Sequence, residues 1–125
     1  MTDAPSFQLF RSSSADKKCR AGETMFSIGD SGDCMFAVQS GEVELILGGE
    51  VLETVGVGGI FGEMSLIERE PRAATAVART DVDLVTIDEK QFAFMTRNTP
   101  NFSLNVLRLI SRRLREMDRN ATART

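Results

Sequence analysis

Short apolar stretches alternate with glycine-marked turns along the middle of the chain, between Lys17 and Asp88. The stretches are rich in Val, Ile, Phe and Thr, the residues that favour strands, and the glycines stand where the chain has to turn. The pattern predicts strands at 17–20, 24–28, 34–39, 42–47, 51–55, 74–79 and 84–87. Many short strands joined by tight turns are typical of a β-sandwich or jelly roll.

Helices are predicted after Ile87, where the glycines stop. Asp88 and Gln91 are spaced as a capping box, which predicts a short helix ending near Asn98. Its large apolar side chains are expected to pack against the strands; they are Phe92, Phe94 and Met95.

A longer helix is predicted to start at Thr99 and Pro100, because threonine caps helices and proline is favoured at the first helical position. Apolar residues recur at helical spacing and give this helix a face that requires burial: Phe102, Val106, Leu109, Ile110, Leu114 and Met117. The arginines fall largely on other faces and are interpreted as a solvated basic surface.

The length of 125 residues fits a single domain, which we place at residues 17–119. Residues 1–16 are expected to form a flexible N-terminal arm that docks through Phe7, Leu9 and Phe10. Residues 120–125 carry no periodic signal and are expected to be a frayed tail. The chain begins at Met1 and is expected to be a complete protein; the alternative is the sensor fragment of a channel or transcription factor.

Composition and charge exclude several partners. Eighteen acidic and fifteen basic residues give a formal net charge of -3, which offers no broad attraction for DNA or anionic lipid. A DNA-reading helix-turn-helix would require a further module. The chain has neither a signal-peptide pattern nor an apolar run long enough for a membrane span, so we expect a cytoplasmic protein with no membrane contact.

The chain contains no histidine, which removes the commonest general base and the usual zinc ligand. We therefore expect no enzyme, no catalytic residue, no metal and no cofactor. Cys19 and Cys34 are expected to be free, partly buried thiols, because two cysteines do not make a disulfide framework.

The segment FGEMSLIEREPRAATA, from Phe61 to Ala76, combines residue types that suit an anion. Gly62 permits a close backbone approach, and residues 63–68 can form one or two helical turns whose first amides are unpaired. The planar guanidinium of Arg72 suits a phosphate. The carboxylate of Glu63 makes sense beside it as the acceptor for a ribose hydroxyl. A surface ion pair between Glu63 and Arg72, the alternative, leaves the glycine and small residues unexplained.

FGEMSL followed by PRAATA resembles the phosphate-binding cassette of cyclic nucleotide-binding domains, as in catabolite activator protein, protein kinase A regulatory subunits and cyclic nucleotide-gated channels. The resemblance extends upstream through AGETMFSIGDSGDCMFAVQSGEVEL and downstream to the last helix. It implies a mainly β fold, a double-stranded β-helix or jelly-roll β-roll, with a short cassette helix and C-terminal helices. It further implies a regulatory module that repositions its last helix, a lid, when a cyclic nucleotide binds.

The resemblance assigns roles to the cassette. The amide of Gly62 and the carboxylate of Glu63 would bind the ribose 2′-hydroxyl, and Arg72 would hold the exocyclic phosphate oxygens. The amides of Ser65 and Ala73 would complete the phosphate cradle. Kinase relatives selective for cyclic GMP (cGMP) commonly carry a threonine after this arginine, so Ala73 favours cyclic AMP (cAMP).

Leu45 and Leu52 are the candidates for an apolar wall against the base, or else plain core residues, and Met64 would border the base. Some family members place an arginine of the lid helix against the base, and by its offset from Pro100 that residue is Arg113 here. Stacking of a guanidinium on a ring is physically reasonable. A solvated Arg113 near the helix end is the alternative, and the rival caps are Ile110 and Leu114.

Family members usually open with a helix before the first strand, and the arm around Phe7 to Phe10 barely has room for one. We expect this to leave an apolar patch for an effector protein or a second copy to cover. An alternative function follows, in which the module keeps the fold but serves only as an interaction surface, with its apolar last helix docking on a partner.

Overall fold

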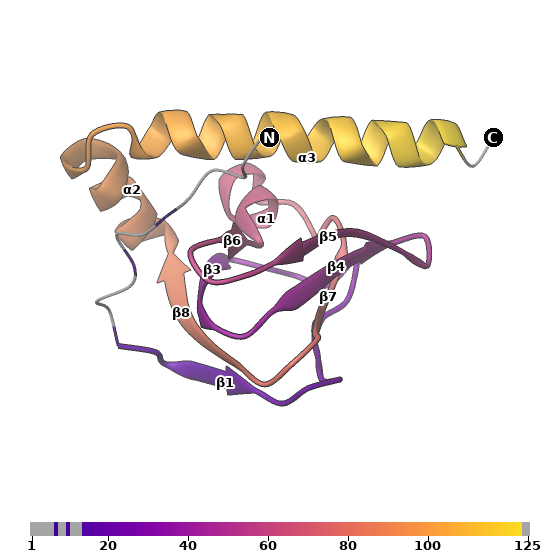
Figure 1. The fold of residues 1–125 in the computed structure, drawn as a ribbon. Helices are drawn as coiled ribbons and strands as arrows, with labels where there is room; N and C mark the ends of the chain where they lie inside the picture. Colours follow the sequence, from indigo (N-terminus) through magenta and orange to yellow (C-terminus); the bar gives the residue numbers. More distant parts are fainter. Residues whose placement is uncertain (1–6, 8–9, 11–13, 124–125) are drawn as a thin grey trace.

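Two four-stranded antiparallel sheets and three helices make up the computed structural model, which describes residues 7, 10 and 14–123 and no side chains after residue 119 (Figure 1). One sheet has the order β1-β8-β3-β6, with strands at Lys17–Cys19, Val82–Asp88, Cys34–Ser40 and Ile60–Phe61. The other has the order β2-β7-β4-β5, with strands at Thr24–Phe26, Thr75–Ala78, Val43–Leu47 and Glu50–Val55. The helices are α1 at Glu63–Glu68, α2 at Glu89–Asn98 and α3 at Phe102–Ala123. This architecture confirms the predicted fold class of mainly β structure with C-terminal helices.

Strand β3 shows why its sequence is apolar on both faces. Phe36 and Val38 point between the two sheets, whereas Met35 and Ala37 point to the opposite face of their sheet, toward the helices. Successive side chains of a strand alternate between faces, so a strand covered on both sides needs apolar residues at every position. The first sheet therefore forms the middle layer of the domain.

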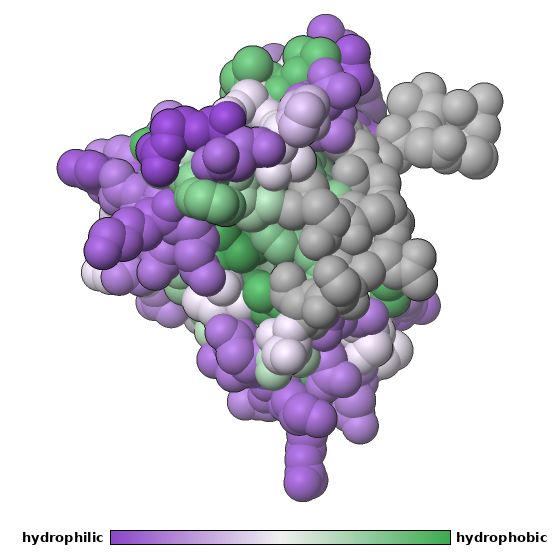
Figure 2. All heavy atoms as spheres, turned by 90° about the vertical axis from the view of Figure 1, so that its left-hand side faces the viewer, coloured by the Kyte–Doolittle hydropathy of each residue, from purple (hydrophilic) through white to green (hydrophobic). Residues whose placement is uncertain are grey.

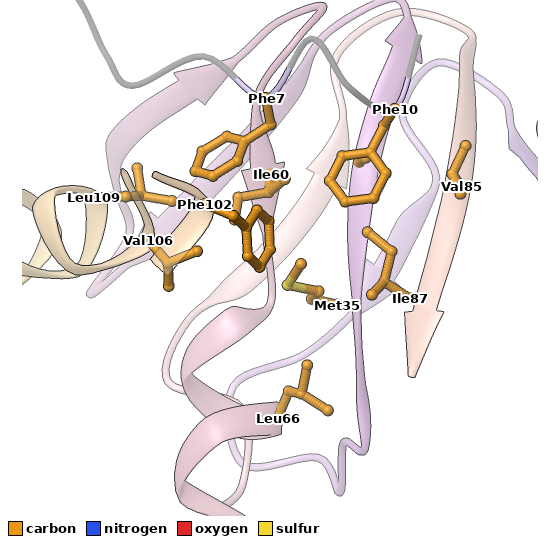
Figure 3. Close-up of a cluster of buried hydrophobic side chains, with 11 residues drawn as sticks. Phe7, Phe10, Met35, Ile60, Leu66, Val85, Ile87, Phe102, Val106 and Leu109 are labelled. Atoms are coloured by element: carbon orange, nitrogen blue, oxygen red, sulfur yellow. The ribbon is translucent and has the colours of Figure 1, made fainter. Parts of the chain in front are cut away.

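One hydrophobic core lies between the two sheets, and a second core joins the middle layer to the helices (Figure 3). Phe102 of α3 lies at its centre, 1% exposed, with its ring edge-on to Phe7, Phe10 and Phe92 at centroid distances of 5.5 to 6.3 Å. Such aromatic pairs stabilise beyond the apolar area that they bury. Phe7 and Phe10 of the arm are thus part of the core, while Leu9 lies outside the described residues.

The strand predictions hold to within a few residues, with one omission. The two-residue strand β6 was not predicted, because so short a segment after a glycine-rich turn has no alternation to detect. Strand β8 begins at Val82, two residues before the predicted start, since Val82 itself is buried between the sheets.

The connection between α2 and α3 corrects the predicted helix start. Thr99 is the C-cap of α2, and its amide donates to the carbonyl of Met95 at 3.0 Å. Asn101 has φ 67°, a left-handed conformation that asparagine tolerates and that interrupts the helix, so α3 begins at Phe102. Pro100 lies in this turn rather than in the first turn of α3. The capping box of Asp88 with Gln91, by contrast, is present as predicted.

Two further expectations need correction. Phe94 of α2 points to solvent and is 58% exposed, whereas Phe92 and Met95 pack against the core. Helix α3 continues through Ala123, so most of the tail expected to fray has helical backbone. Alanine is the strongest helix former, and residues 120–123 contain no glycine or proline to end the helix.

Both cysteines are free thiols. Cys19 lies on β1 and Cys34 on β3, with β8 between these strands. Burial raises the pKa of the Cys19 thiol, and the nearby charge of Glu23 raises it further. Cys19 is therefore a packing residue between the sheets.

Hydrophobic side chains surround a hollow of about 380 Å³ beside α2. Figure 2 shows the corresponding face, where apolar atoms gather within a hydrophilic frame. The hollow is lined by Phe10, Val85, Ile87, Lys90, Gln91, Phe94, Met95 and Thr99. Phe10 is the one described arm residue in this lining, and the sequence had predicted an apolar patch left by the short arm without locating it.

Truncation of Phe102 tests the second core. Phe102→Ala removes the ring that three other phenylalanines contact, and we expect a loss of about 3 to 5 kcal/mol in the free energy of unfolding, measured in urea. The matched control is Phe94→Ala on α2, whose exposed ring should change stability by no more than about 0.5 kcal/mol. Equal losses in the two variants would contradict this assignment of the core.

Candidate functional site

A small cavity of about 40 Å³ lies between α1, the segment after it, the second sheet and α3. Eight of the nine predicted ligand-binding residues line it: Leu45, Gly62, Glu63, Met64, Ser65, Arg72, Ala73 and Arg113. The remaining one, Leu52, is half-buried on β5 and is not among the lining residues. The fold therefore brings residues from four separate elements to one place.

The guanidinium of Arg72 is buried in the wall of this cavity without a carboxylate. Arg72 is 5% exposed, and Nη1 donates to the carbonyl of Gly62 at 3.0 Å. Its guanidinium carbon lies 4.2 Å from the ring centroid of Phe26, and Nε has no hydrogen-bond partner. Within the described part of the chain, no acidic side chain forms an ion pair with Arg72. A buried charge without a counter-charge is costly, so the site is prepared for an anion.

The surrounding backbone holds Arg72 in this position. A Cβ on Gly32 would collide with Nε and Cζ of Arg72, so the close approach requires glycine there. The amide of Arg72 donates to the carbonyl of Asp30 at 2.8 Å. The Ser65 hydroxyl lies 2.9 Å from the carbonyl of Gly32 and 2.6 Å from that of Glu70, and donates its single proton to one of them at a time. These bonds join the loop before β3 to both ends of the cassette.

Helix α3 contributes Arg113, which binds two carboxylates at once. Its Nη1 donates to Glu63 Oε1 at 2.6 Å, and its Nε donates to Glu53 Oε1 at 2.8 Å. Nη2 donates to the carbonyl of Ile60 at 2.6 Å and to Glu53 Oε2 at 3.3 Å. The interpretation of Arg113 as a solvated residue is therefore wrong, because this side chain is only 6% exposed.

The electrostatics of this cluster keep Arg113 charged. Burial opposes the charged form, but the carboxylates of Glu63 and Glu53 more than compensate and raise the pKa of Arg113 above its ordinary value. Glu63 is buried to a similar degree and accepts no hydrogen bond at Oε2 from the described side chains. Oε1 of Glu63 thus binds Arg113 of α3, and Oε2 remains available to accept a further hydrogen bond.

The residues of α3 that were predicted to cover the base differ in whether they line the cavity. Leu114 is 53% exposed and Ile110 packs against the helix-side core, so neither lines the cavity. Met117, one turn after Arg113, lines it instead. The predicted apolar stripe of the helix included Met117, but nothing in the spacing separated it from the core residues.

Three other residues were missed by sequence reasoning. Phe26 and Ala74 line the cavity, and Glu53 holds Arg113. Phe26 was predicted only as part of a strand, and Ala74 was noted only for its small size. Glu53 gave no signal, because an acidic residue on an alternating strand is usually solvated.

Among the described residues, no group of three or more His, Cys, Asp and Glu side chains could hold a metal ion. No helix in the same part of the chain is long and apolar enough to cross a bilayer.

Comparison with known proteins identifies the family of the chain. The family model for the cyclic nucleotide-binding domain matches residues 16–99. The chain is 38% identical over 102 residues to the cyclic AMP receptor protein of Thermus thermophilus. The aligned segment covers 78% of this chain and 47% of the relative. It is 42% identical over 77 residues to a cAMP-dependent protein kinase regulatory subunit of Yarrowia lipolytica, covering 62% of this chain and 20% of the relative. The chain belongs to the cyclic nucleotide-binding domain family.

A solved structure supports the fold assignment. The structure described as cAMP-bound PfPKA-R (141-441) superposes with a TM-score of 0.75 at 26% identity, covering 84% of this chain and 36% of that one. The jelly-roll fold implied by the cassette is thereby confirmed. The chain spans about half or less of the length of the curated relatives named above.

Removal of Arg113 tests the buried cluster. Arg113→Met leaves two carboxylates without their shared cation, and we expect a loss of about 3 to 5 kcal/mol in the free energy of unfolding, followed by circular dichroism in urea. The control Arg115→Met, on the exposed side of the same helix, should change stability by no more than about 0.5 kcal/mol. Indistinguishable variants would show that Arg113 contributes nothing beyond a surface arginine.

Proposed function

We propose that this chain is a regulatory module that binds a cyclic nucleotide, cAMP in preference to cGMP, and that repositions α3 on binding. The observation that carries the proposal is the buried guanidinium of Arg72, which among the described residues has no carboxylate partner and an unpaired Nε. A cyclic phosphate supplies one negative charge, which is the charge that this side chain lacks. The exocyclic oxygens of the phosphate would bind to Arg72.

The cassette supplies complementary groups for the sugar. The free Oε2 of Glu63 would accept the ribose 2′-hydroxyl, together with the amide of Gly62, and the amides of Ser65 and Ala73 would complete the phosphate cradle. Gly62 has φ 83° at the N-cap of α1, a conformation that favours glycine and leaves its backbone open to a ligand. Leu45 and Met64 line the cavity where the base would lie, and Leu52 is the one proposed contact that requires the ligand to extend beyond it.

The small volume of the cavity supports a movement on binding. About 40 Å³ is well below the roughly 300 to 1,000 Å³ of small-molecule sites. Arg113 and Met117 of α3 form part of the wall, so entry of a nucleotide would displace their side chains or the helix. The ligand shifts α3 only by the difference in its affinity for the two arrangements.

The preference for cAMP rests on Ala73 and on the names of the relatives. A threonine at this position in cGMP-selective kinase relatives would offer a hydroxyl to guanine, and Ala73 has none. The relatives named above are a cyclic AMP receptor and a cAMP-dependent regulatory subunit. We infer a non-catalytic, cytoplasmic role, in which α3 transmits the change to an effector protein.

Loss of Arg72 tests the proposed function. Arg72→Ala should weaken cAMP binding by roughly 1.5 to 3 kcal/mol in isothermal titration calorimetry, the range for a hydrogen bond to a charged group. In wild type, cAMP should raise the melting temperature, cGMP should compete less well than cAMP, and plain AMP should have no effect.

The matched control is Arg79→Ala, which removes an exposed arginine of a surface pair with Glu42 and should bind cAMP like the wild type. A wild-type protein that shows no heat and no thermal shift with either cyclic nucleotide would refute the proposed function. Equal binding by wild type and Arg72→Ala would refute the role of Arg72 alone.

A second candidate function is an interaction module that docks through α3. Three exposed leucines favour it: Leu104, Leu107 and Leu114 are 43%, 63% and 53% exposed. Residues three, four and seven apart lie on one side of a helix, so these leucines form a strip on the surface of α3. A second copy of the chain, with the same strip, is the partner that we propose.

Charge on the strip tests self-association. Leu107→Glu with Leu114→Glu should shift a concentration-dependent dimer to monomer in sedimentation velocity, because carboxylates would be buried in the interface. Both side chains are exposed in the single chain, so cAMP binding and melting temperature in dilute solution should stay at wild-type values. A wild-type protein that remains monomeric at all concentrations would exclude this function.

A further inference from the structure

Arg113 forms the boundary between two cavities. On one side is the candidate nucleotide cavity, which Glu63 lines. On the other side is a cavity of about 120 Å³ beneath α3, lined by Glu53, Ile60, Leu109 and the glycine-rich loop Gly56–Gly59. Arg113 lines both cavities, with one carboxylate on each side.

The contacts of Arg113 are unequally divided between these two sides. Nε and Nη2 bind Glu53 in a fork, and Nη2 also binds the carbonyl of Ile60. Only Nη1 reaches Glu63. A planar guanidinium that binds a carboxylate with two nitrogens is well fixed in orientation, so Glu53 is the stronger anchor. Loss of the bond to Glu63 alone would leave the other contacts of Arg113 intact.

We propose that Glu53 is a positioning residue of the nucleotide site, which retains Arg113 when entry of the nucleotide displaces the Arg113 side chain from the cavity wall and breaks its bond to Glu63 Oε1. The inference rests on the proposed function and adds a residue that the cassette does not contain. Arg113 would then move toward the 120 Å³ cavity with its charge still paired.

The energetic reason is the cost of an unpaired buried charge. Without Glu53, the guanidinium of Arg113 has Glu63 as its one carboxylate, and a ligand whose entry separates Arg113 from Glu63 leaves the cation without a carboxylate partner among the described residues. Glu53 therefore lowers the cost of separating Arg113 from Glu63. The opposite mechanism, in which Glu53 is a latch that keeps α3 closed, predicts the opposite sign, because removal of a latch would strengthen binding.

The decisive measurement is cAMP affinity in Glu53→Gln, a substitution that keeps size and removes charge. We expect binding about 10-fold weaker or more than in wild type by calorimetry, since a charged hydrogen-bond acceptor is lost. Glu53→Asp, which retains the charge, should recover part of the affinity. The matched control is Glu50→Gln on the same strand, where the exposed side chain has no contact with Arg113 and binding should be unchanged. Unchanged or stronger binding by Glu53→Gln would overturn the proposal while leaving the proposed function intact.

A second readout follows Arg113 directly and separates positioning from general destabilisation. The Nε proton of Arg113, bonded to Glu53 at 2.8 Å, should give a protected signal in ¹H–¹⁵N spectra of the wild type that persists at saturating cAMP. The signal should be lost in Glu53→Gln and kept in Glu50→Gln. Disappearance of the wild-type signal on saturation would show that Glu53 does not retain Arg113. A wild type that binds no cyclic nucleotide while keeping this signal would refute the proposed function, and with it the role of Glu53 toward a ligand.

Discussion

The bonds of the Arg113 guanidinium are the interaction on which the arrangement around the cavity depends. One side chain from α3 joins Glu53 on β5, the carbonyl of Ile60 on β6 and Glu63 on α1. Because removal of one partner from a buried ion pair costs far more than the pair itself contributes, a shift of one element away from the others is costly unless Arg113 keeps a carboxylate partner. The cassette and the last helix, which are far apart in the sequence, are therefore coupled by an electrostatic contact and not only by packing.

The other buried guanidinium that lines the cavity, that of Arg72, differs from Arg113 in its charge partners. In the described part of the chain, Arg113 binds two carboxylates and Arg72 binds none, although both side chains are about equally buried. A ligand that offers one negative charge and one hydroxyl donor complements this asymmetry, since the charge would pair with Arg72 and the hydroxyl would donate to Oε2 of Glu63, the oxygen that Arg113 does not bind. A cyclic nucleotide has these two groups on adjoining parts of one ring system. A simple anion would satisfy Arg72 but would have nothing to offer Glu63.

Much of the fold followed from local signals in the sequence. Alternation, glycine turns and the capping box at Asp88 are short-range properties, and the elements that they predict are present. The start of α3 was misjudged because a cap-like Thr99 before Pro100 looks the same whether a helix begins or ends there. The start of α3 at Phe102 is set by the left-handed conformation of Asn101, which depends on how α3 turns back across the sheets.

The residues themselves indicated the part of the site that lies in one continuous segment, whereas Leu45 and Arg113 were predicted through the family resemblance. Gly62, Glu63 and Arg72 could be identified because their neighbours in sequence are also their neighbours in space. Glu53 could not, because its importance comes from a residue of α3 that is 60 positions away. Gly32 was visible only as a turn residue, although the position of Arg72 depends on its missing side chain. Long-range contacts of this kind are set by the tertiary fold and leave no spacing pattern.

Helix α3 is held by different forces along its length, and this difference bears on how a ligand could move it. Phe102, Val106 and Leu109 bury its first half in the core (Figure 3). Beyond Ile110 the apolar contacts become fewer, since Leu114 is exposed, and the main polar contact is that of Arg113. Buried ion pairs gain little net stability after desolvation, whereas apolar burial gains much. A ligand whose entry displaces Arg113 would therefore act on the weakly held half, while the aromatic cluster around Phe102 keeps the helix attached to the domain.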